Sequence, residues 1–117
     1  MLFKDKHIRD IKEGRKTVTR RCWKRKMAKE GGVYPMQQRM FQPKSECPGF
    51  IRVTVEPFKQ RLGDMTEQDA QMEGGYTLDE FKRLWKKYSG TDWNPDLEVW
   101  VVPFEFHPMD DSDGGQR

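Results

Sequence analysis

The segment that most constrains the fold is "LEVWVVPFEF", residues 97–106. In an extended chain, successive side chains point to opposite faces of a sheet. One face of this segment carries Trp100, Val102, Phe104 and Phe106, and the other carries Leu97, Val99 and Val101. A strand that is apolar on both faces is covered on both faces. We therefore expect residues 97–106 to form a central strand of a sheet or part of a closed barrel.

Three further segments favour strands. The stretch 17–23, "TVTRRCW", is rich in β-branched residues, and 50–58, "FIRVTVEPF", alternates apolar and polar residues. In 17–23, Val18 and Cys22 are candidates for the buried face. A short strand is expected within 33–37, and the rest of 24–49 is predicted to be a long loop, which in a compact domain is often functional.

Three helices are predicted from their end signals. A short helix at 6–13 follows Asp5 as a candidate N-cap and stops at Gly14. Thr66 begins a second helix that ends at Met72 or Glu73, with Asp69 in the capping-box position. The third helix, 77–90, has a capping box from Thr77 and Glu80 and an apolar stripe along one face.

The order of these elements predicts the fold class. The strands are few and are not separated by regular crossover helices, so we expect an α+β domain with a small, strongly curved sheet or barrel flanked by helices. A chain of 117 residues is most simply one domain. The last residues, 109–117, have almost no apolar content, and we predict a disordered C-terminal tail.

Charge is concentrated at one end of the chain. Residues 1–30 hold 12 Lys and Arg against 4 Asp and Glu, whereas residues 31–117 hold 10 against 15. A dense basic segment attracts phosphates, so an anionic partner such as RNA is expected. The absence of a long apolar run or an apolar leader argues against a membrane partner and for a soluble, cytoplasmic protein.

The cysteines and histidines are too few for a metal cluster. Only Cys22, Cys47, His7 and His107 are present, without ligand spacing, so we expect no metal and no cofactor. Two reduced cysteines suit a cytoplasmic chain better than one disulfide. The sequence leaves the oligomeric state open, with a monomer favoured.

The stretch "GRKTVTRR", residues 14–21, allows three interpretations. It is a solvated basic patch, it binds nucleic-acid phosphates, or Lys16 and a threonine are catalytic. Positions three apart on a regular strand face opposite sides. Lys16 and Thr19 can therefore converge only if Lys16 lies on a turn, which Gly14 permits.

Three blocks of the chain resemble ASCH domains. "GRKTVTRR" is similar to the G-x-K-x-x-[E/T]-x-R signature of that family. "LGDMTEQDAQMEGGYTLDEFKRLW" (62–85) and the 97–106 segment resemble its later blocks, and order and spacing agree over about residues 3–107. The resemblance implies a PUA-like fold over residues 1–108, a β-barrel of about five to six strands flanked by short helices. It also implies a cleft for RNA or nucleosides.

Thr19 makes the chain similar to one branch of the family, the small N(4)-acetylcytidine amidohydrolases, in which threonine replaces a common glutamate. The resemblance implies that Lys16, Thr19 and Glu73 are catalytic. The segment 24–49 is longer than in that branch, and Arg20 stands where the small enzymes have an apolar residue.

The chemistry sets conditions on these residues. A threonine hydroxyl needs a base to take its proton, and a lysine is a base only if its pKa falls through desolvation or nearby cations. Glu73 could orient Lys16, bond the polar edge of the base, or act on the leaving N4. Arg15, Arg20 and Arg21 are the candidates for such cations. The candidates for contacts with the ligand or RNA are Arg15, Arg20, Arg21, Lys24, Tyr34 and Arg39.

Two alternatives to the amidohydrolase stay open. The first is a non-catalytic PUA-like module that binds RNA, which the basic residues 1–30 favour. The second, with less support, is a ribonuclease. The partner in each case is a modified nucleoside or RNA.

Overall fold

A computed structural model describes residues 1–108, and the predicted disordered tail at 109–117 lies outside the described residues. The elements follow in the order α1 (Asp5–Lys12), β1 (Val18–Arg21), β2 (Val33–Pro35), β3 (Phe50–Val53), β4 (Phe58–Arg61), α2 (Glu67–Met72), α3 (Leu78–Ser89) and β5 (Glu98–His107). Short 3₁₀ turns lie at Lys44–Glu46 and Leu62–Asp64. This order confirms the predicted α+β class.

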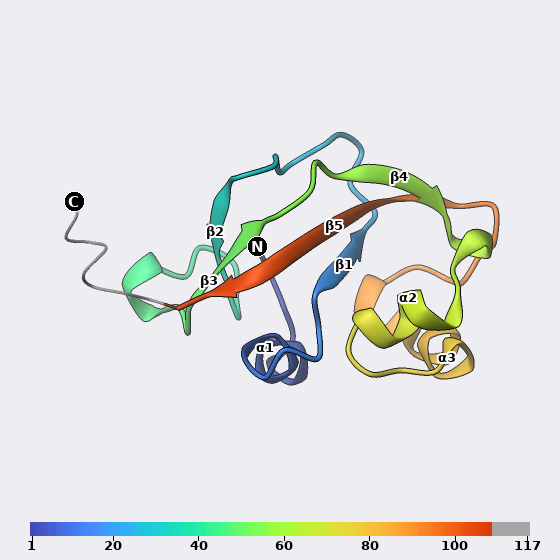
Figure 1. Cartoon of the computed structure of the whole chain (residues 1–117), viewed down its shortest axis with the longest axis horizontal. Coiled ribbons are helices and arrows are strands. Elements are labelled where there is room, and N and C mark those ends of the chain that lie inside the picture. Colours follow the sequence, from blue (N-terminus) through green and yellow to red (C-terminus); the bar gives the residue numbers. More distant parts are fainter. Residues whose placement is uncertain (109–117) are drawn as a thin grey trace.

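Strand β5 is the centre of the sheet, as its two apolar faces predict. It pairs antiparallel with β1, β3 and β4, and β2 extends the sheet from β3 (Figure 1). Both β3 and β4 lie along the edge of β5 opposite β1. The Thr54 amide donates to the Pro103 carbonyl on that edge, and the Phe104 amide donates to the Thr17 carbonyl on the other. The five strands form an open sheet among the described residues rather than a closed barrel.

The predicted strand 50–58 is wrong in its second half. The chain pairs with the C-terminal half of β5 through β3, leaves the sheet at residues 54–57, and pairs with the N-terminal half of β5 through β4. The break coincides with Pro57, which cannot donate to a ladder, and with Pro103 opposite on β5. Strand β4 itself is polar and exposed and was not predicted as a strand.

The helices form where their end signals predict. Both capping boxes are present, with Thr66 and Asp69 at α2 and Thr77 and Glu80 at α3, and Gly90 ends α3 in the left-handed conformation. Helix α1 differs slightly, because Asp5 is its first residue and Lys4 occupies the N-cap position without a side-chain cap.

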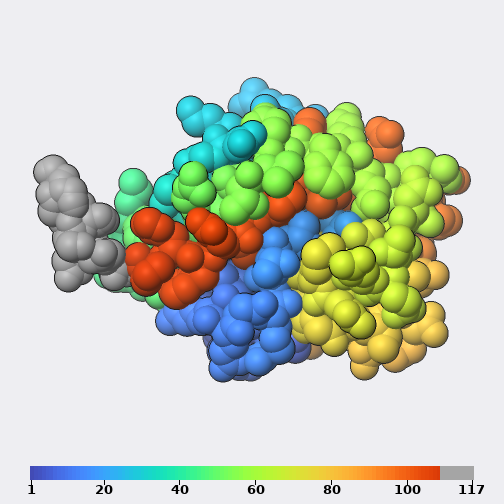
Figure 2. All heavy atoms as spheres, in the orientation of Figure 1, coloured from blue at the N-terminus to red at the C-terminus, as the bar shows by residue number. Residues whose placement is uncertain are grey.

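Three apolar clusters pack against the sheet, and residues of two of them line the site. One joins α2 and α3 to the start of β5 and contains Leu62, Met65, Ala70, Tyr76, Phe81, Trp85 and Val99. The other joins α1 to β3 and the end of β5 and contains Phe3, Ile8, Ile11, Met36, Ile51 and Phe104. Figure 2 shows the N-terminal segment, in blue, against the α2–α3 segment, in yellow, along one face. None of the helices in residues 1–108 has the length and apolar character needed to cross a membrane.

The fold predicts a sharp contrast between two aliphatic residues of one segment. Ile51 is fully buried in β3, whereas Val55 is 49% exposed on the 54–57 bridge. We expect Ile51→Ala to lower the free energy of unfolding by about 2–5 kcal/mol, through lost burial and a residual cavity. Val55→Ala should change it by less than about 0.5 kcal/mol. Urea unfolding measures both values, and an equal loss in the two variants would contradict this assignment of the core.

Candidate functional site

The turn after α1 places Lys16 inside the protein. Gly14 has a φ of +82°, and the amides of Arg15 and Lys16 both donate to the Asp10 carbonyl, at 2.8 and 3.1 Å. Glycine adopts this left-handed conformation without strain. Lys16 therefore precedes the start of β1, and its side chain turns inward with 2% exposure.

The Lys16 ammonium is held by three acceptors. It donates to the Val18 carbonyl at 2.9 Å, to the Glu73 carbonyl at 3.0 Å and to Glu73 Oε1 at 2.9 Å. An ammonium has three hydrogens, so each can be satisfied within the protein. This pairing joins the start of β1 to the C-terminal end of α2, where Glu73 is the C-cap residue.

Glu73 is shared between two cations. Its Oε2 accepts a hydrogen bond from Arg20 Nη1 at 2.8 Å, while Oε1 accepts the one from Lys16. Arg20 is held further by Gln60, whose Oε1 accepts from Nε and Nη2, and its Nη2 lies 3.6 Å from Asp69 Oδ2. Lys16, Arg20 and Glu73 are 2%, 7% and 3% exposed, so this is a buried cluster of ions.

Burial lowers the pKa of Lys16 from its ordinary value, because the interior disfavours the charged ammonium. The neighbouring Arg21 and Arg20 act in the same direction, whereas the charge and hydrogen bond of Glu73 oppose the shift. Sharing Glu73 with Arg20 limits that opposition, since the carboxylate does not neutralise Lys16 alone. The arrangement brings Lys16 closer to acting as a base than an exposed lysine would be.

Thr19 and Arg21 form the next layer of the site. Arg21 Nε donates to Thr19 Oγ1 at 3.2 Å, and Arg21 Nη2 donates to the Leu2 carbonyl at 2.6 Å. Thr19 is buried, although the alternation along β1 would place it opposite Val18. Both faces of β1 are covered, and the predicted burial of Cys22 is wrong because the chain has left the sheet there and Cys22 is exposed.

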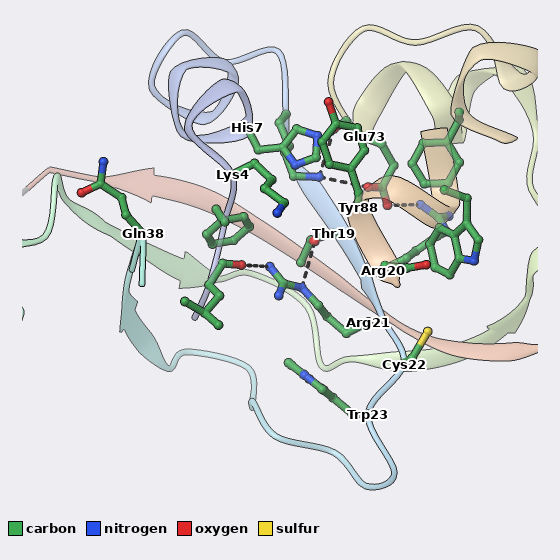
Figure 3. A pocket seen from close by; sticks show the side chains of 16 residues that line it. Lys4, His7, Thr19, Arg20, Arg21, Cys22, Trp23, Gln38, Glu73 and Tyr88 are labelled. Atoms are coloured by element: carbon green, nitrogen blue, oxygen red, sulfur yellow. Dashed lines mark hydrogen bonds and ion pairs between the residues drawn. The ribbon is translucent and has the colours of Figure 1, made fainter. Parts of the chain in front are cut away.

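These side chains line one cavity of about 440 Å³ (Figure 3). Its buried base includes Lys16, Thr19, Arg20 and Glu73, and its more exposed mouth includes Lys4, Cys22 and Gln38. Aromatic side chains form much of the remaining wall, namely Phe3, Trp23, Phe81, Trp85 and Tyr88. The cavity thus combines an ionic end with aromatic surfaces on which a flat ring can lie.

The structure brings together five of the nine candidate residues. Lys16, Thr19, Glu73, Arg20 and Arg21 line the cavity. The other four lie outside its lining: Arg15 pairs with Asp10 and Glu13, Arg39 pairs with Glu46, the Tyr34 hydroxyl accepts from the Lys29 amide, and Lys24 is exposed.

Sequence reasoning missed several residues of the cavity. Lys4 and His7 come from α1 and its N-cap, and Tyr88 comes from the apolar stripe of α3, a pattern that is typical of a core-facing helix. A lysine immediately before a helix is an unusual choice, because the positive end of the helix dipole disfavours a cation there. That was the one local signal for Lys4.

His7 is buried in the wall beside Lys16. Its Nε2 is 2.9 Å from the Tyr76 hydroxyl. Burial, and then the charges of Lys16 and Lys6, lower its pKa to about 3, with Asp10 opposing and Arg21 adding to the shift. His7 is therefore neutral at pH 7. Among residues 1–108, no group of three His, Cys, Asp or Glu side chains is placed to hold a metal ion.

The fold and the cavity define a small α+β domain with a buried ionic cluster, and solved structures share its architecture. The ASCH domain from Lactobacillus crispatus JV V101 has a TM-score of 0.66 at 15% identity, over 86% of this chain and 69% of that one. A DUF984 protein from Enterococcus faecalis V583 has a TM-score of 0.61 at 21% identity, over 98% and 80% of the two chains. No protein-family model and no curated protein matches the sequence. The chain therefore shares the fold of these two solved structures, one of which is an ASCH domain, and this confirms the α+β fold that the resemblance implies.

The burial of His7 predicts a pH dependence of stability. Because its pKa in the folded state is about 3 and that in the unfolded chain is about 6.5, the unfolded state binds more protons between these values. The contribution of neutral His7 to the free energy of unfolding is fully present above pH 6.5 and is lost as the pH falls. We expect the free energy of unfolding to fall by up to about 1.4 kcal/mol per pH unit below pH 6.5.

Urea unfolding between pH 6.5 and 5 measures this dependence without much carboxylate titration. The variant His7→Asn should flatten the slope, while His107→Asn, at the half-buried second histidine, should retain it. An unchanged slope in His7→Asn would show that another group causes the dependence.

Proposed function

We propose that the cavity binds a modified cytosine base and hydrolyses its N(4)-acyl amide, as in N(4)-acetylcytidine. The observation that carries this proposal is that Lys16, Thr19 and Glu73 line one cavity. Its volume of about 440 Å³ lies in the range of roughly 300–1,000 Å³ that is usual for small-ligand pockets. The aromatic walls suit a flat base, and the ionic end suits its polar edge.

The proposed chemistry begins with Thr19. Neutral Lys16 takes the hydroxyl proton, and Thr19 Oγ1 bonds to the acyl carbon. The bond from that carbon to N4 then breaks, and N4 receives the proton from Lys16, which releases cytidine. Water hydrolyses the resulting threonine ester to acetate and restores the hydroxyl.

The surroundings of Lys16 and Thr19 support these roles. The lowered pKa of Lys16 favours its neutral form, and Arg20 holds Glu73 so that the carboxylate does not neutralise the lysine alone. The hydrogen bond from Arg21 Nε fixes the Thr19 oxygen and stabilises negative charge as it develops there.

Incubation with N(4)-acetylcytidine tests the proposal. We expect cytidine and acetate as products, separated by liquid chromatography. Thr19→Val, which keeps the shape of the side chain, should lower kcat/KM by about 100-fold or more. Lys16→Met should do the same, because it keeps the length of the side chain and removes the amine.

Thr17→Val is the matched control, because Thr17 lies two positions from Thr19 and is exposed outside the lining of this cavity. It should retain activity. Circular dichroism establishes that each variant is folded. Absence of cytidine after long incubation at high protein concentration would refute the hydrolase.

One observation favours a second candidate, a module that binds RNA without turnover. All three acceptors of the Lys16 ammonium belong to the protein, which is the pattern of a charge that supports structure. The basic residues 1–30 would then serve to attract the RNA backbone.

Salt dependence tests this candidate. The affinity for single-stranded RNA, measured by fluorescence anisotropy, should fall steeply between 50 and 200 mM salt. Lys24→Gln should reduce the slope of log affinity against log salt by about 1 if Lys24 contacts a phosphate. Lys82→Gln, an exposed lysine on α3, is the control and should leave the slope unchanged. An affinity that does not vary with salt would count against RNA binding.

A further inference from the structure

Two cations of the cavity have no anionic partner. Lys16 and Arg20 share the Glu73 carboxylate, but Lys4 and Arg21 take part in no ion pair within residues 1–108. Even with Lys16 neutral, as the proposed reaction requires, the lining holds Lys4, Arg20 and Arg21 against one carboxylate, while His7 is neutral at pH 7. Lys4 is exposed and needs no partner within the protein, but Arg21 is half-buried, and buried cations are ordinarily paired.

Arg21 is fixed in place by neutral groups alone. Thr19 Oγ1 and the Leu2 carbonyl accept from Nε and Nη2, and the guanidinium carbon lies 4.7 Å from the centre of the Phe3 ring. Burial lowers the pKa of Arg21 to about 10, so the group stays protonated at neutral pH. Among the described residues, no acceptor bonds to Nη1. Arg21 is thus a preorganised, half-buried cation with a donor left for a ligand.

Lys4 lies at the mouth of the same cavity. It is the N-cap residue of α1 and gives that helix no side-chain cap. A cation at this end of a helix opposes the helix dipole, so Lys4 does not stabilise α1. Figure 3 shows the Lys4 amine and the Arg21 guanidinium both directed into the cavity, above and beside Thr19.

A free nucleoside cannot balance these charges, since neither its base nor its sugar is ionised near neutral pH. A phosphate group can, because it carries negative charge and several strong acceptor oxygens that suit a guanidinium and an ammonium. Lys4 and Arg21 lie toward the mouth, whereas Lys16 and Glu73 lie at the buried base.

We propose that Lys4 and Arg21 form a phosphate-binding subsite at the mouth of the cavity, so that the cavity binds a phosphorylated cytidine more tightly than the free nucleoside. The identity of the base rests on the proposed function, but the phosphate subsite rests on Lys4 and Arg21. The phosphate belongs either to a 5′-monophosphate or to the backbone of an RNA in which the cytidine lies.

Calorimetric titration of the whole protein with cytidine and cytidine 5′-monophosphate tests the subsite without any turnover. We expect the monophosphate to bind about tenfold or more tightly at low salt, because a charged partner strengthens each hydrogen bond. The dissociation constant for cytidine divided by that for the monophosphate should shrink toward one in Arg21→Gln. The same ratio should fall at least about threefold in Lys4→Gln. Arg21→Lys, which keeps the charge but loses the fixed fork, should show an intermediate ratio.

Lys12→Gln is the matched control. It removes one positive charge from the exposed end of α1 and does not line the cavity, so the ratio should stay as in the wild type. A cytidine-containing trinucleotide distinguishes the two sources of phosphate. Tighter binding of the trinucleotide than of the monophosphate assigns the subsite to RNA, and the reverse order assigns it to a free nucleotide.

Equal affinities for cytidine and its monophosphate in the wild type would overturn the proposal. A ratio that survives both Lys4→Gln and Arg21→Gln would overturn it too, as would failure of both ligands to bind at about millimolar concentration. The outcome is separate from the hydrolase test. A phosphate preference without cytidine release refutes only the reaction, and cytidine release without a phosphate preference refutes only the subsite.

Discussion

The pairing of β5 with three other strands is the constraint on which the rest of the structure depends. Strand β1 occupies one edge of β5, and β3 and β4 follow one another along the other edge. Because β1 is anchored in this way, the turn at Gly14 leads Lys16 to a defined place beneath the sheet. The apolar character of both faces of β5 stabilises this central position, since helices or loops cover each face.

The second constraint is the buried carboxylate of Glu73. Burying Lys16 and Arg20 would be costly if either lost its partner, so the end of α2 must stay against β1. The same cluster limits the charge that the cavity can neutralise by itself, which leaves Lys4 and Arg21 uncompensated. A buried ion cluster and a cationic mouth therefore follow from one arrangement. Within residues 14–21, Lys16 and Arg20 bind Glu73, whereas Arg21 donates to Thr19.

Arg20 departs from the family pattern, and its contacts give a physical reason for the difference. The family pattern that the sequence resembles predicts an apolar residue at this position. Here the guanidinium reaches Glu73 on one side and Gln60 on the other, and Gln60 belongs to β4. The strand that the sequence pattern did not predict is therefore the one that supplies a partner to the ionic cluster.

The sequence by itself determined the local elements of this protein. Capping boxes at Thr66 and Thr77, the stop at Gly90 and the apolar faces of residues 97–106 depend on neighbours only a few positions away, and each prediction was confirmed. The tertiary structure decided where strand 50–58 breaks and which side chains share the cavity. Lys16 and Glu73 are 57 positions apart, and Arg21 and Leu2 are 19 apart. Contacts over such separations arise from the pairing of β5 and the docking of the helices, and no local pattern of residues specifies them.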